Sequence, residues 1–245
     1  MAGIWGKIIG GAAGFAVGGP LGALVGAVAG HAVDRMRADK PDDGGADHAR
    51  ETAFTIAVIA LSAKMAKADG RVTRDEVDTF KRIFQVPPDE MKNVGRVFDL
   101  ARKSASGYEP YARQVARMFQ ANPAVLEELL DALFMIARAD QVMHPAEISF
   151  LREISRIFGF DEAVFERIRA SHAGAGSADP YAVLGVSHDA GDEKVRAAWR
   201  ALIRENHPDK LIAQGMPEDF VAVATEKMAA INAAWDQICA QRGLK

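Results

Sequence analysis

Three neighbouring residues near the C-terminal end, His207, Pro208 and Asp209, combine an imidazole, a rigid ring and a carboxylate. Proline disfavours helical geometry at the residue before it, so the tripeptide is expected to stand at an exposed corner after a helix. A histidine and an aspartate could serve in catalysis, but they would need a paired nucleophile or a shared metal ion. The chain offers neither a Ser or Cys elbow nor a His cluster. We therefore expect no enzyme activity and no cofactor.

The residues before this corner predict an amphipathic helix from about residue 192 to residue 206. Its apolar positions recur with helical spacing and build one face, made of Val195, Ala198, Trp199, Leu202 and Ile203. The far side carries Arg196, Arg200 and Arg204, each four residues from the next, and Lys210 follows the corner. Solvated basic faces are common, so this stripe indicates a function only because it lies beside the tripeptide.

Two further helices are expected to hold the basic helix in place. A helix from about residue 218 to residue 241 carries apolar residues spaced by four and three, namely Ala224, Met228, Ile231, Trp235 and Ile238. The two long helices can therefore pair as an antiparallel hairpin. A short helix that contains Tyr181 and Leu184 can close the open side of the hairpin.

Residues 179–245 resemble a complete J domain. The resemblance rests on the run Asp-Pro-Tyr-Ala-Val-Leu-Gly-Val at 179–186, the basic helix, the His-Pro-Asp tripeptide and the run Ile-Asn-Ala-Ala-Trp at 231–235. Trp199 and Trp235 stand where J domains usually have tyrosine, and Gly191 occupies the usual position of a helix-capping serine. The resemblance implies that seven residues bind a DnaK-type chaperone and favour its ATP hydrolysis: His207, Pro208, Asp209, Arg196, Arg200, Arg204 and Lys210.

The overall composition gives no sign of a nucleic-acid partner. The 245 residues are 49% hydrophobic and carry a net charge of −3, which permits one substantial core and a smaller one. This balance creates no general field for nucleic acid, and the basic stripe lacks interleaved exposed aromatic residues. Cys239, the single cysteine, excludes an internal disulfide and a four-Cys zinc site. We expect no nucleic-acid partner.

An uncharged segment of 23 residues, Ile8 to Gly30, is long enough to cross a lipid bilayer as one helix. Glycines recur in it at every fourth residue and form a stripe that another helix could approach, which predicts a homodimer: Gly10, Gly14, Gly18, Gly22, Gly26 and Gly30. The run Gly18-Gly19-Pro20 argues against insertion, because it could break the helix. We assign residues 1–33 to a membrane anchor and residues 34–48 to a linker.

The charges beside this segment predict its orientation. Arg35, Arg37 and Lys40 follow the span, whereas only Lys7 and the terminal amine precede it. By the positive-inside rule the C-terminal domains face the cytoplasm, and the chain crosses the inner membrane once. A cleaved signal peptide is the alternative, but no convincing small-x-small cleavage site precedes the linker.

Residues 49–170 show helical periodicity throughout and contain an internal repeat at an offset of 71 residues. The run Met-Ala-Lys-Ala-Asp at 65–69 aligns with Ile-Ala-Arg-Ala-Asp at 136–140, and two related helical hairpins are implied. This segment resembles the TerB-like all-helical domain, whose halves each carry an Ala-Asp turn followed by a glutamate that opens the next helix.

The acidic residues of these two turns permit two interpretations. Asp69, Glu76, Asp140 and Glu147 could offer oxygen ligands to a metal ion if the two repeats bring their turns together. Helix capping is the favoured interpretation, because the run Thr-Arg-Asp-Glu at 73–76 fits a capping box and Pro145 suits a first helical position.

The order of these parts is informative as a whole. Residues 171–178 have the composition of a linker, and they separate the TerB-like segment from the J-domain segment. A membrane span, a TerB-like domain and a C-terminal J domain in this order resemble the DjlA type of J protein. We therefore predict an all-α, membrane-anchored co-chaperone for a DnaK-type partner, with a client protein that the sequence does not identify. The alternative is a membrane-associated scaffold or ion-sensing adaptor that acts through the TerB-like domain.

Overall fold

The structure is a computed structural model that describes residues 19–22, 45–69, 74–84, 86, 88, 91–103, 107–140, 143–173 and 178–244. The described residues contain helices and no strand, which confirms the all-α prediction. The larger group consists of α4 (Gly45–Asp69), α5 (Arg74–Phe84), α6 (Met91–Lys103), α7 (Glu109–Met118), α8 (Pro123–Ala137), α9 (Pro145–Ile157) and α10 (Glu162–Ser171). The second group consists of α11 (Pro180–Leu184), α12 (Asp192–Glu205), α13 (Pro208–Ala213), the 3₁₀ turn η2 (Glu218–Phe220) and α14 (Val221–Arg242).

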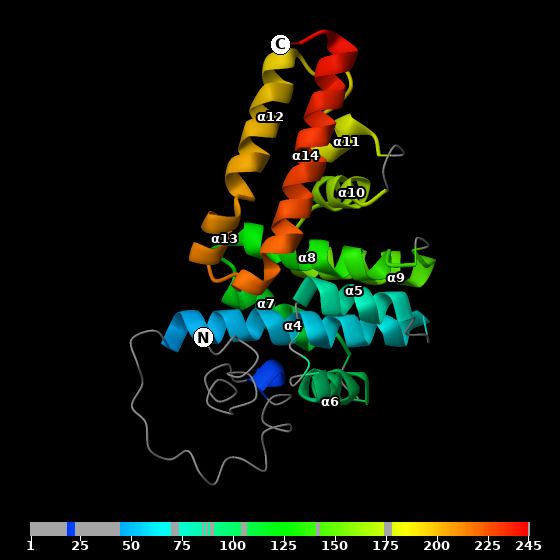
Figure 1. The fold of residues 1–245 in the computed structure, drawn as a ribbon, viewed down its shortest axis with the longest axis vertical. Coiled ribbons are helices and arrows are strands. Elements are labelled where there is room, and N and C mark those ends of the chain that lie inside the picture. Colours follow the sequence, from blue (N-terminus) through cyan, green and yellow to red (C-terminus); the bar gives the residue numbers. More distant parts are fainter. Residues whose placement is uncertain are drawn as a thin grey trace.

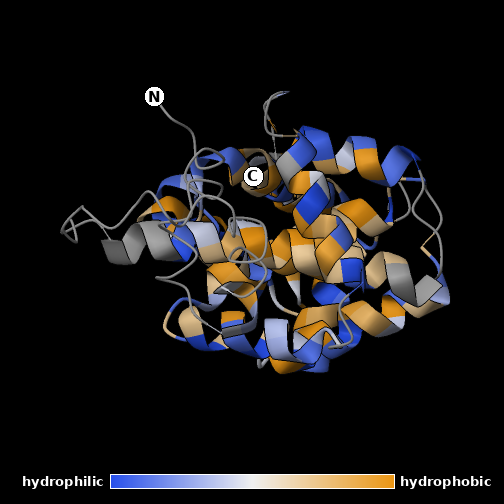
Figure 2. Cartoon of the chain, turned by 90° about the horizontal axis from the view of Figure 1, so that it is seen from below, coloured by the Kyte–Doolittle hydropathy of each residue, from blue (hydrophilic) through white to orange (hydrophobic). Residues whose placement is uncertain are grey.

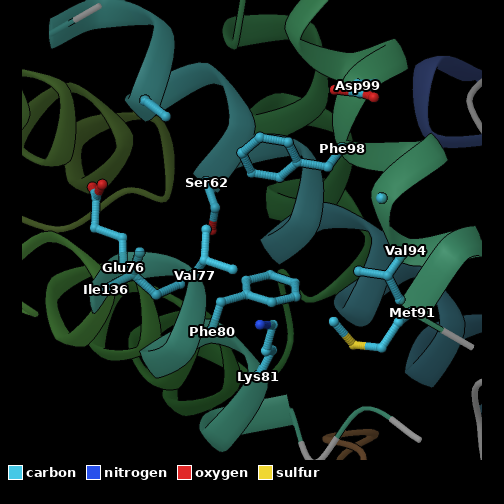
Figure 3. A pocket seen from close by; sticks show the side chains of 12 residues that line it. Ser62, Glu76, Val77, Phe80, Lys81, Met91, Val94, Phe98, Asp99 and Ile136 are labelled. Atoms are coloured by element: carbon cyan, nitrogen blue, oxygen red, sulfur yellow. The ribbon is translucent and has the colours of Figure 1, made fainter. Parts of the chain in front are cut away.

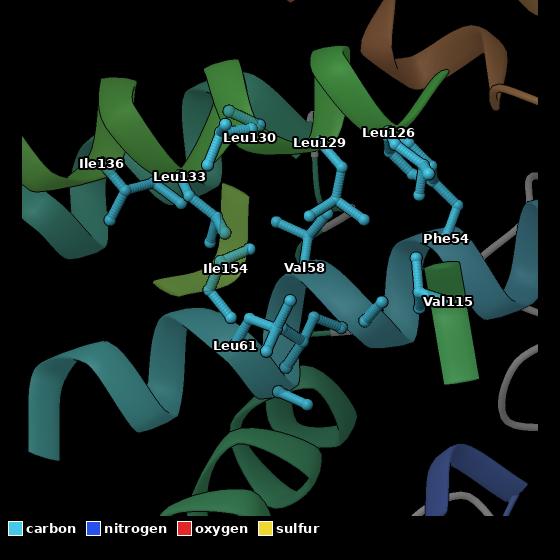
Figure 4. Close-up of a cluster of buried hydrophobic side chains, with 14 of the residues drawn as sticks. Phe54, Val58, Leu61, Val115, Leu126, Leu129, Leu130, Leu133, Ile136 and Ile154 are labelled. Carbon is cyan, nitrogen blue, oxygen red and sulfur yellow. The ribbon is translucent and has the colours of Figure 1, made fainter. Parts of the chain in front are cut away.

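Helix α4 forms the centre of the larger domain because it is apolar on every side. All residues from Ala53 to Leu61 are fully buried, as expected for a helix without a polar face. Helices α6, α7, α8 and α9 pack around it (Figure 1). Phe54, Val58 and Leu61 of α4 face the leucines of α8 in Figure 4. Seen from the side of α4, the helices at the rim carry many hydrophilic residues, whereas the middle is mostly hydrophobic (Figure 2).

The internal repeat corresponds to two pairs of successive helices that pack against each other. Helices α4 and α5 are the first pair, α8 and α9 are the second, and α8 contacts both helices of the first pair. The second pair turns at a capping box, in which the Glu147 carboxylate accepts a hydrogen bond from the His144 backbone N–H at 2.8 Å. In return, the His144 ring accepts one from the backbone N–H of Ala146 at 3.3 Å.

The second group forms the expected hairpin of α12 and α14, closed by α11. Its own small core contains Tyr181, Leu184, Val195, Ile231 and Ile238. The two tryptophans stack with ring centroids 4.8 Å apart, and Trp199 Nε1 donates a hydrogen bond to Asn232 Oδ1 at 3.0 Å. Stacked indoles therefore serve as the apolar contact between the helices at these positions.

One end of this hairpin packs into the larger domain. Leu211 of α13, Met216 and Phe220 are fully buried within the same apolar cluster as α4 and α8. Phe220 meets Phe54 edge to face at a centroid distance of 4.5 Å. The sequence pattern assigned Ala224 to the hairpin core, but the structure places it in the larger cluster, because α14 crosses from one core to the other.

Candidate functional site

The tripeptide predicted from sequence lies at a sharp corner between two helices. Helix α12 ends at Glu205, and His207 has an extended backbone with φ −66° and ψ 128°. Pro208 then opens α13, where its missing N–H costs no helical hydrogen bond. The His207 ring accepts a hydrogen bond from the Asp209 backbone N–H at 3.3 Å, so the histidine caps the helix that follows it.

This corner presents its chemistry to solvent. The His207 side chain is 51% exposed and the Asp209 side chain is 90% exposed, and His207 Nδ1 lies 3.8 Å from Asp209 Oδ2. Asn206, just before them, is buried and binds back to the Leu202 carbonyl through its side chain at 2.8 Å. Asn206 thus fixes the end of α12, and the exposed His207 imidazole and Asp209 carboxylate follow directly after it.

The basic residues predicted to accompany the corner lie mostly on the accessible side of α12. Arg200, Arg204 and Lys210 are exposed, and Arg204 makes only a long surface ion pair of 3.9 Å with Glu205. Arg196 differs, because it is half-buried and its guanidinium lies 5.9 Å from the centroid of the Trp235 ring. The structure therefore groups three of the four basic residues with the corner as solvent-accessible cations.

The end of the hairpin farther from His207 is closed by Arg242 near the C-terminus of α14. Its guanidinium donates to Tyr181 Oη at 2.9 Å, to Asp192 Oδ1 at 2.8 Å, and to the carbonyls of Ala190 and His188 at 2.7 and 2.9 Å. These bonds connect α14 with α11 and with the start of α12. They compensate for Gly191, which provides no side-chain cap for α12.

The end of the hairpin near His207 is held by a buried group of charges, which we call the Lys227 cluster and define as Lys227, Glu127, Glu128, Asp131, Arg167 and His172. Lys227 Nζ of α14 lies 2.5 Å from Glu127 Oε1, 2.9 Å from Glu128 Oε1 and 2.7 Å from Asp131 Oδ2, all on α8. Its side chain is 4% exposed, and the three carboxylate side chains are 11%, 0% and 2% exposed. The contact therefore joins the two helical groups in a site almost closed to water.

Arg167 of α10 and His172, the residue at the C-terminal end of that helix, complete the Lys227 cluster. Arg167 Nη2 lies 2.6 Å from Glu127 Oε2, and the His172 ring is hydrogen-bonded to Asp131 Oδ1 at 2.8 Å. The His172 ring also stacks on Phe134 at a centroid distance of 5.3 Å. Three buried carboxylates thus face two permanent cations and one imidazole.

The ionisation of this cluster follows from burial and from the charge of Lys227. Burial raises the pKa of Glu128 to about 7. Burial opposes ionisation of Asp131 as well, but the charge of Lys227 and the bond with His172 outweigh it and lower the pKa of that carboxyl to about 2. For Lys227, burial is outweighed by the three carboxylates, which raise the pKa of its ammonium group. Lys227 is therefore charged, and Glu128 is the carboxyl that takes up a proton near neutral pH.

Helical spacing alone did not predict the Lys227 cluster, although the sequence contains a signal for it. Lys227 stands three residues after Ala224 and four before Ile231, on the apolar face of α14. Glu127, Glu128 and Asp131 are the charged residues of the otherwise apolar α8. A lysine on one apolar face and carboxylates on another predict a buried ion pair only if the two helices are known to meet.

The acidic residues proposed as metal ligands are not gathered into a site. Glu76 and Glu147 are buried, whereas Asp140 is exposed, and the Asp69 side chain lies outside the described residues. Among the residues described, no group of three or more His, Cys, Asp or Glu side chains could hold a metal ion. Glu147 is engaged in the capping box, which agrees with capping as the favoured interpretation.

The predicted anchor falls almost wholly outside the described residues. Gly10, Gly14, Gly18, Gly26 and Gly30 are not described, and Gly22 is buried in a short helical turn of residues 19–22. In that turn, Leu21 is fully buried in the apolar cluster of the larger domain, and its backbone N–H donates to Gln114 Oε1 of α7 at 3.0 Å. For these four residues the structure therefore differs from the predicted bilayer span. Within the described residues, no helix combines the length and apolar character needed to cross a membrane.

An apolar cavity of about 220 Å³ opens between α4, α5 and α6, with Ile136 of α8 in its wall. Figure 3 shows the side chains of Val77, Phe80, Val94 and Phe98 around it. Ser62 also lines the cavity, and its buried hydroxyl has no hydrogen-bond partner among the described residues. The cavity is thus mostly apolar, although Glu76, Lys81 and Asp99 also line it, and the Ser62 hydroxyl is its unused hydrogen-bonding group.

Three family models match this chain, one for each part expected from the sequence. They are Co-chaperone DjlA transmembrane domain at residues 1–48, Tellurite resistance protein TerB at residues 55–170 and DnaJ domain at residues 179–242. The N-terminal match supports membrane anchoring, whereas orientation and self-association are not addressed by it. No solved structure matches the chain.

Several relatives match this chain over almost its whole length. The chain is 28% identical to Co-chaperone protein DjlA of Photobacterium profundum, with 99% of this chain and 100% of that protein covered. It is 30% identical to the proteins of the same name from Aliivibrio fischeri and Vibrio cholerae, with 99% of both chains covered in each case. With a membrane domain, a TerB domain and a J domain in this order, the chain belongs to the DjlA co-chaperone family, a family of non-enzymatic J-domain proteins.

Proposed function

We propose that this protein recruits a DnaK-type chaperone and stimulates its ATP hydrolysis through the J domain. One observation carries the proposal: the exposed His207 and Asp209 side chains stand on a fixed corner beside the exposed cations Arg200, Arg204 and Lys210. Pro208 sets the backbone of that corner. Such a corner offers a compact set of polar contacts to a protein surface, while the cations favour an acidic partner.

The mechanism has two parts that differ in range. Arg200, Arg204 and Lys210 attract an acidic chaperone surface over about a Debye length, so this part weakens as salt rises. His207 and Asp209 then make short-range contacts that the chaperone offers only in its hydrolysing conformation. Binding that conformation more tightly than the others shifts the population of the chaperone towards it. Arg196, held over Trp235, contributes mainly to the α12–α14 contact.

We propose that the N-terminal membrane domain anchors this activity at the inner membrane. We propose a single span, with the TerB and J domains in the cytoplasm, because Arg35, Arg37 and Lys40 follow the uncharged segment. The glycines at every fourth residue, from Gly10 to Gly30, support a homodimer through the span. Anchoring raises the effective concentration of the J domain near membrane clients.

A second function, as an adaptor acting through the TerB domain, is favoured by the cavity between α4, α5 and α6. Its walls suit apolar side chains of a client helix, and Val77 at its edge is the one large hydrophobic residue that is exposed among the described residues. Grooves of this kind receive the apolar face of a helix. The same cavity has little to offer a metal ion, since its walls are mostly hydrocarbon.

The experiment for the main proposal is single-turnover ATP hydrolysis by the DnaK-type chaperone of the same cell, with the full chain in lipid nanodiscs. We expect wild type to accelerate hydrolysis, His207→Gln to abolish the acceleration, and added salt to reduce it. Lys92→Gln, an exposed change on α6, is the control and should behave as wild type. Equal acceleration by His207→Gln would contradict the proposal and favour the adaptor function.

A further inference from the structure

The corner at His207 begins α13, a helix too short to be stable in isolation. Helix α13 has six residues, Pro208–Ala213, and isolated helices of that length are unstable in water. Its apolar anchor, Leu211, is fully buried in the cluster formed with the TerB domain and not in the core of the J domain. The geometry of the corner therefore depends on contact between the two domains.

The contact has apolar and ionic parts on the same side of α14. Phe220 packs on Phe54 of α4, and the Asn122 side chain donates to the Gln214 carbonyl at 3.4 Å. Farther along α14, Lys227 reaches the three carboxylates of α8 at 2.5–2.9 Å. A buried charge group favours this geometry, because a displaced lysine would leave buried carboxylates uncompensated.

We propose that the Lys227 cluster is an interdomain lock that positions the His207–Pro208–Asp209 corner for the chaperone. Lys227 is thus a positioning residue, which acts through α13 and does not touch the chaperone. The TerB domain becomes part of the unit that presents the J domain, rather than a separate module joined by a linker. The effect on chaperone stimulation rests on the proposed function, whereas the lock itself does not.

The lock is tested by a distance within the full chain. In a Cys239→Ser background, spin labels at Ser149→Cys on α9 and Glu193→Cys on α12 report on the two domains through exposed positions. We expect one narrow distance distribution in wild type and a broad one in Lys227→Met, with the ratio of docked to undocked molecules falling about a hundredfold or more. Lys92→Met is the matched control and should stay narrow. A narrow distribution in Lys227→Met would overturn the lock.

Lys227→Met leaves three buried carboxylates without their cation and could misfold for that reason. A second variant therefore serves as a control for misfolding. Lys227→Met combined with Glu128→Gln removes one carboxylate with the lysine and cannot form the three-way contact. We expect it to retain wild-type helix content while the distance distribution is broad. Retained helix content with a narrow distribution would also overturn the lock.

A rescue experiment distinguishes a positioning role of Lys227 from a purely structural one. Cysteines at Asn122 and Gln214 in the Cys239→Ser background, joined by a short bismaleimide, hold the domains together without Lys227. Stimulation of chaperone ATPase should fall several-fold in Lys227→Met and return after crosslinking. Failure of the crosslink to restore it would contradict positioning. If wild type gives no stimulation while its distance distribution is narrow, the proposed function fails and the lock stands.

Discussion

The two ends of the J-domain hairpin are each held by a cation of α14, but in different surroundings. Arg242 binds Tyr181, Asp192 and two carbonyls within the J domain, and Asp192 is 55% exposed. Lys227 binds three carboxylates of another domain, and none of its partners exceeds 11% exposure. The Arg242 end of the hairpin is therefore held by contacts within the J domain, whereas the Lys227 end is held by contacts with the TerB domain.

The surroundings of each cation determine how far a mutation at that end should perturb the structure. A solvent-screened cation affects mainly the groups it touches, because water can replace its partners. A buried cation among carboxylates affects both domains, because its loss leaves the buried carboxylates of the neighbouring domain uncompensated. The end that carries the candidate chaperone-binding corner is thus the end whose geometry is shared between domains.

The largest effect is expected from Lys227→Met. Removing one partner of a buried charge group destabilises by about 3–5 kcal/mol, because the remaining charges lose their compensation. Chemical denaturation of the full chain in nanodiscs measures this loss, with Lys92→Met as the control. A loss no larger than that of the control would show that the buried contact contributes nothing to stability.

A smaller and local effect is expected from Arg242→Ala. It removes charge-assisted hydrogen bonds at a partly exposed site, which should lower stability by much less than Lys227→Met does. Hydrogen exchange should accelerate at residues 181–192, with α8 unchanged. Acceleration that extended to α8 would contradict the distinction between the two ends.

Glu128→Gln should change the pH dependence of stability. Wild-type Glu128 keeps its proton up to a pKa of about 7 in the folded state and to its ordinary value of 4.5 when unfolded. Between these values the folded state binds more protons, so stability falls as pH rises, by about 1 kcal/mol per pH unit. The variant should lose this decline in denaturation curves at pH 5, 6 and 7. An unchanged slope would show that Glu128 is not the group that titrates.

The smallest effect on stability is expected from His207→Gln. The side chain is half exposed, and an amide oxygen can replace the ring as acceptor for the Asp209 N–H, so stability should change by less than about 0.5 kcal/mol. Denaturation beside the ATPase assay checks this. A large loss of stability would mean that any loss of stimulation in this variant reflects unfolding.

Sequence patterns predicted the helices of both domains and the corner at His207, because these depend on local spacing and on Pro208. The repeat in the TerB segment also followed from sequence, since aligned runs fold alike. The Lys227 cluster did not, because periodicity identifies a buried face without naming the helix that covers it. The composition of residues 171–178 suggested a linker between separate domains, but composition carries no information on contacts made elsewhere in the chain.

Chaperone binding at the His207 corner is tested most directly by hydrogen exchange of the full chain in nanodiscs, with and without the ATP-bound chaperone. We expect slower exchange at the amides of residues 204–213, around the corner and α13, with no change in α5 and α6. Protection of α5 and α6 without protection of the corner would contradict binding at the corner and assign partner binding to the TerB domain.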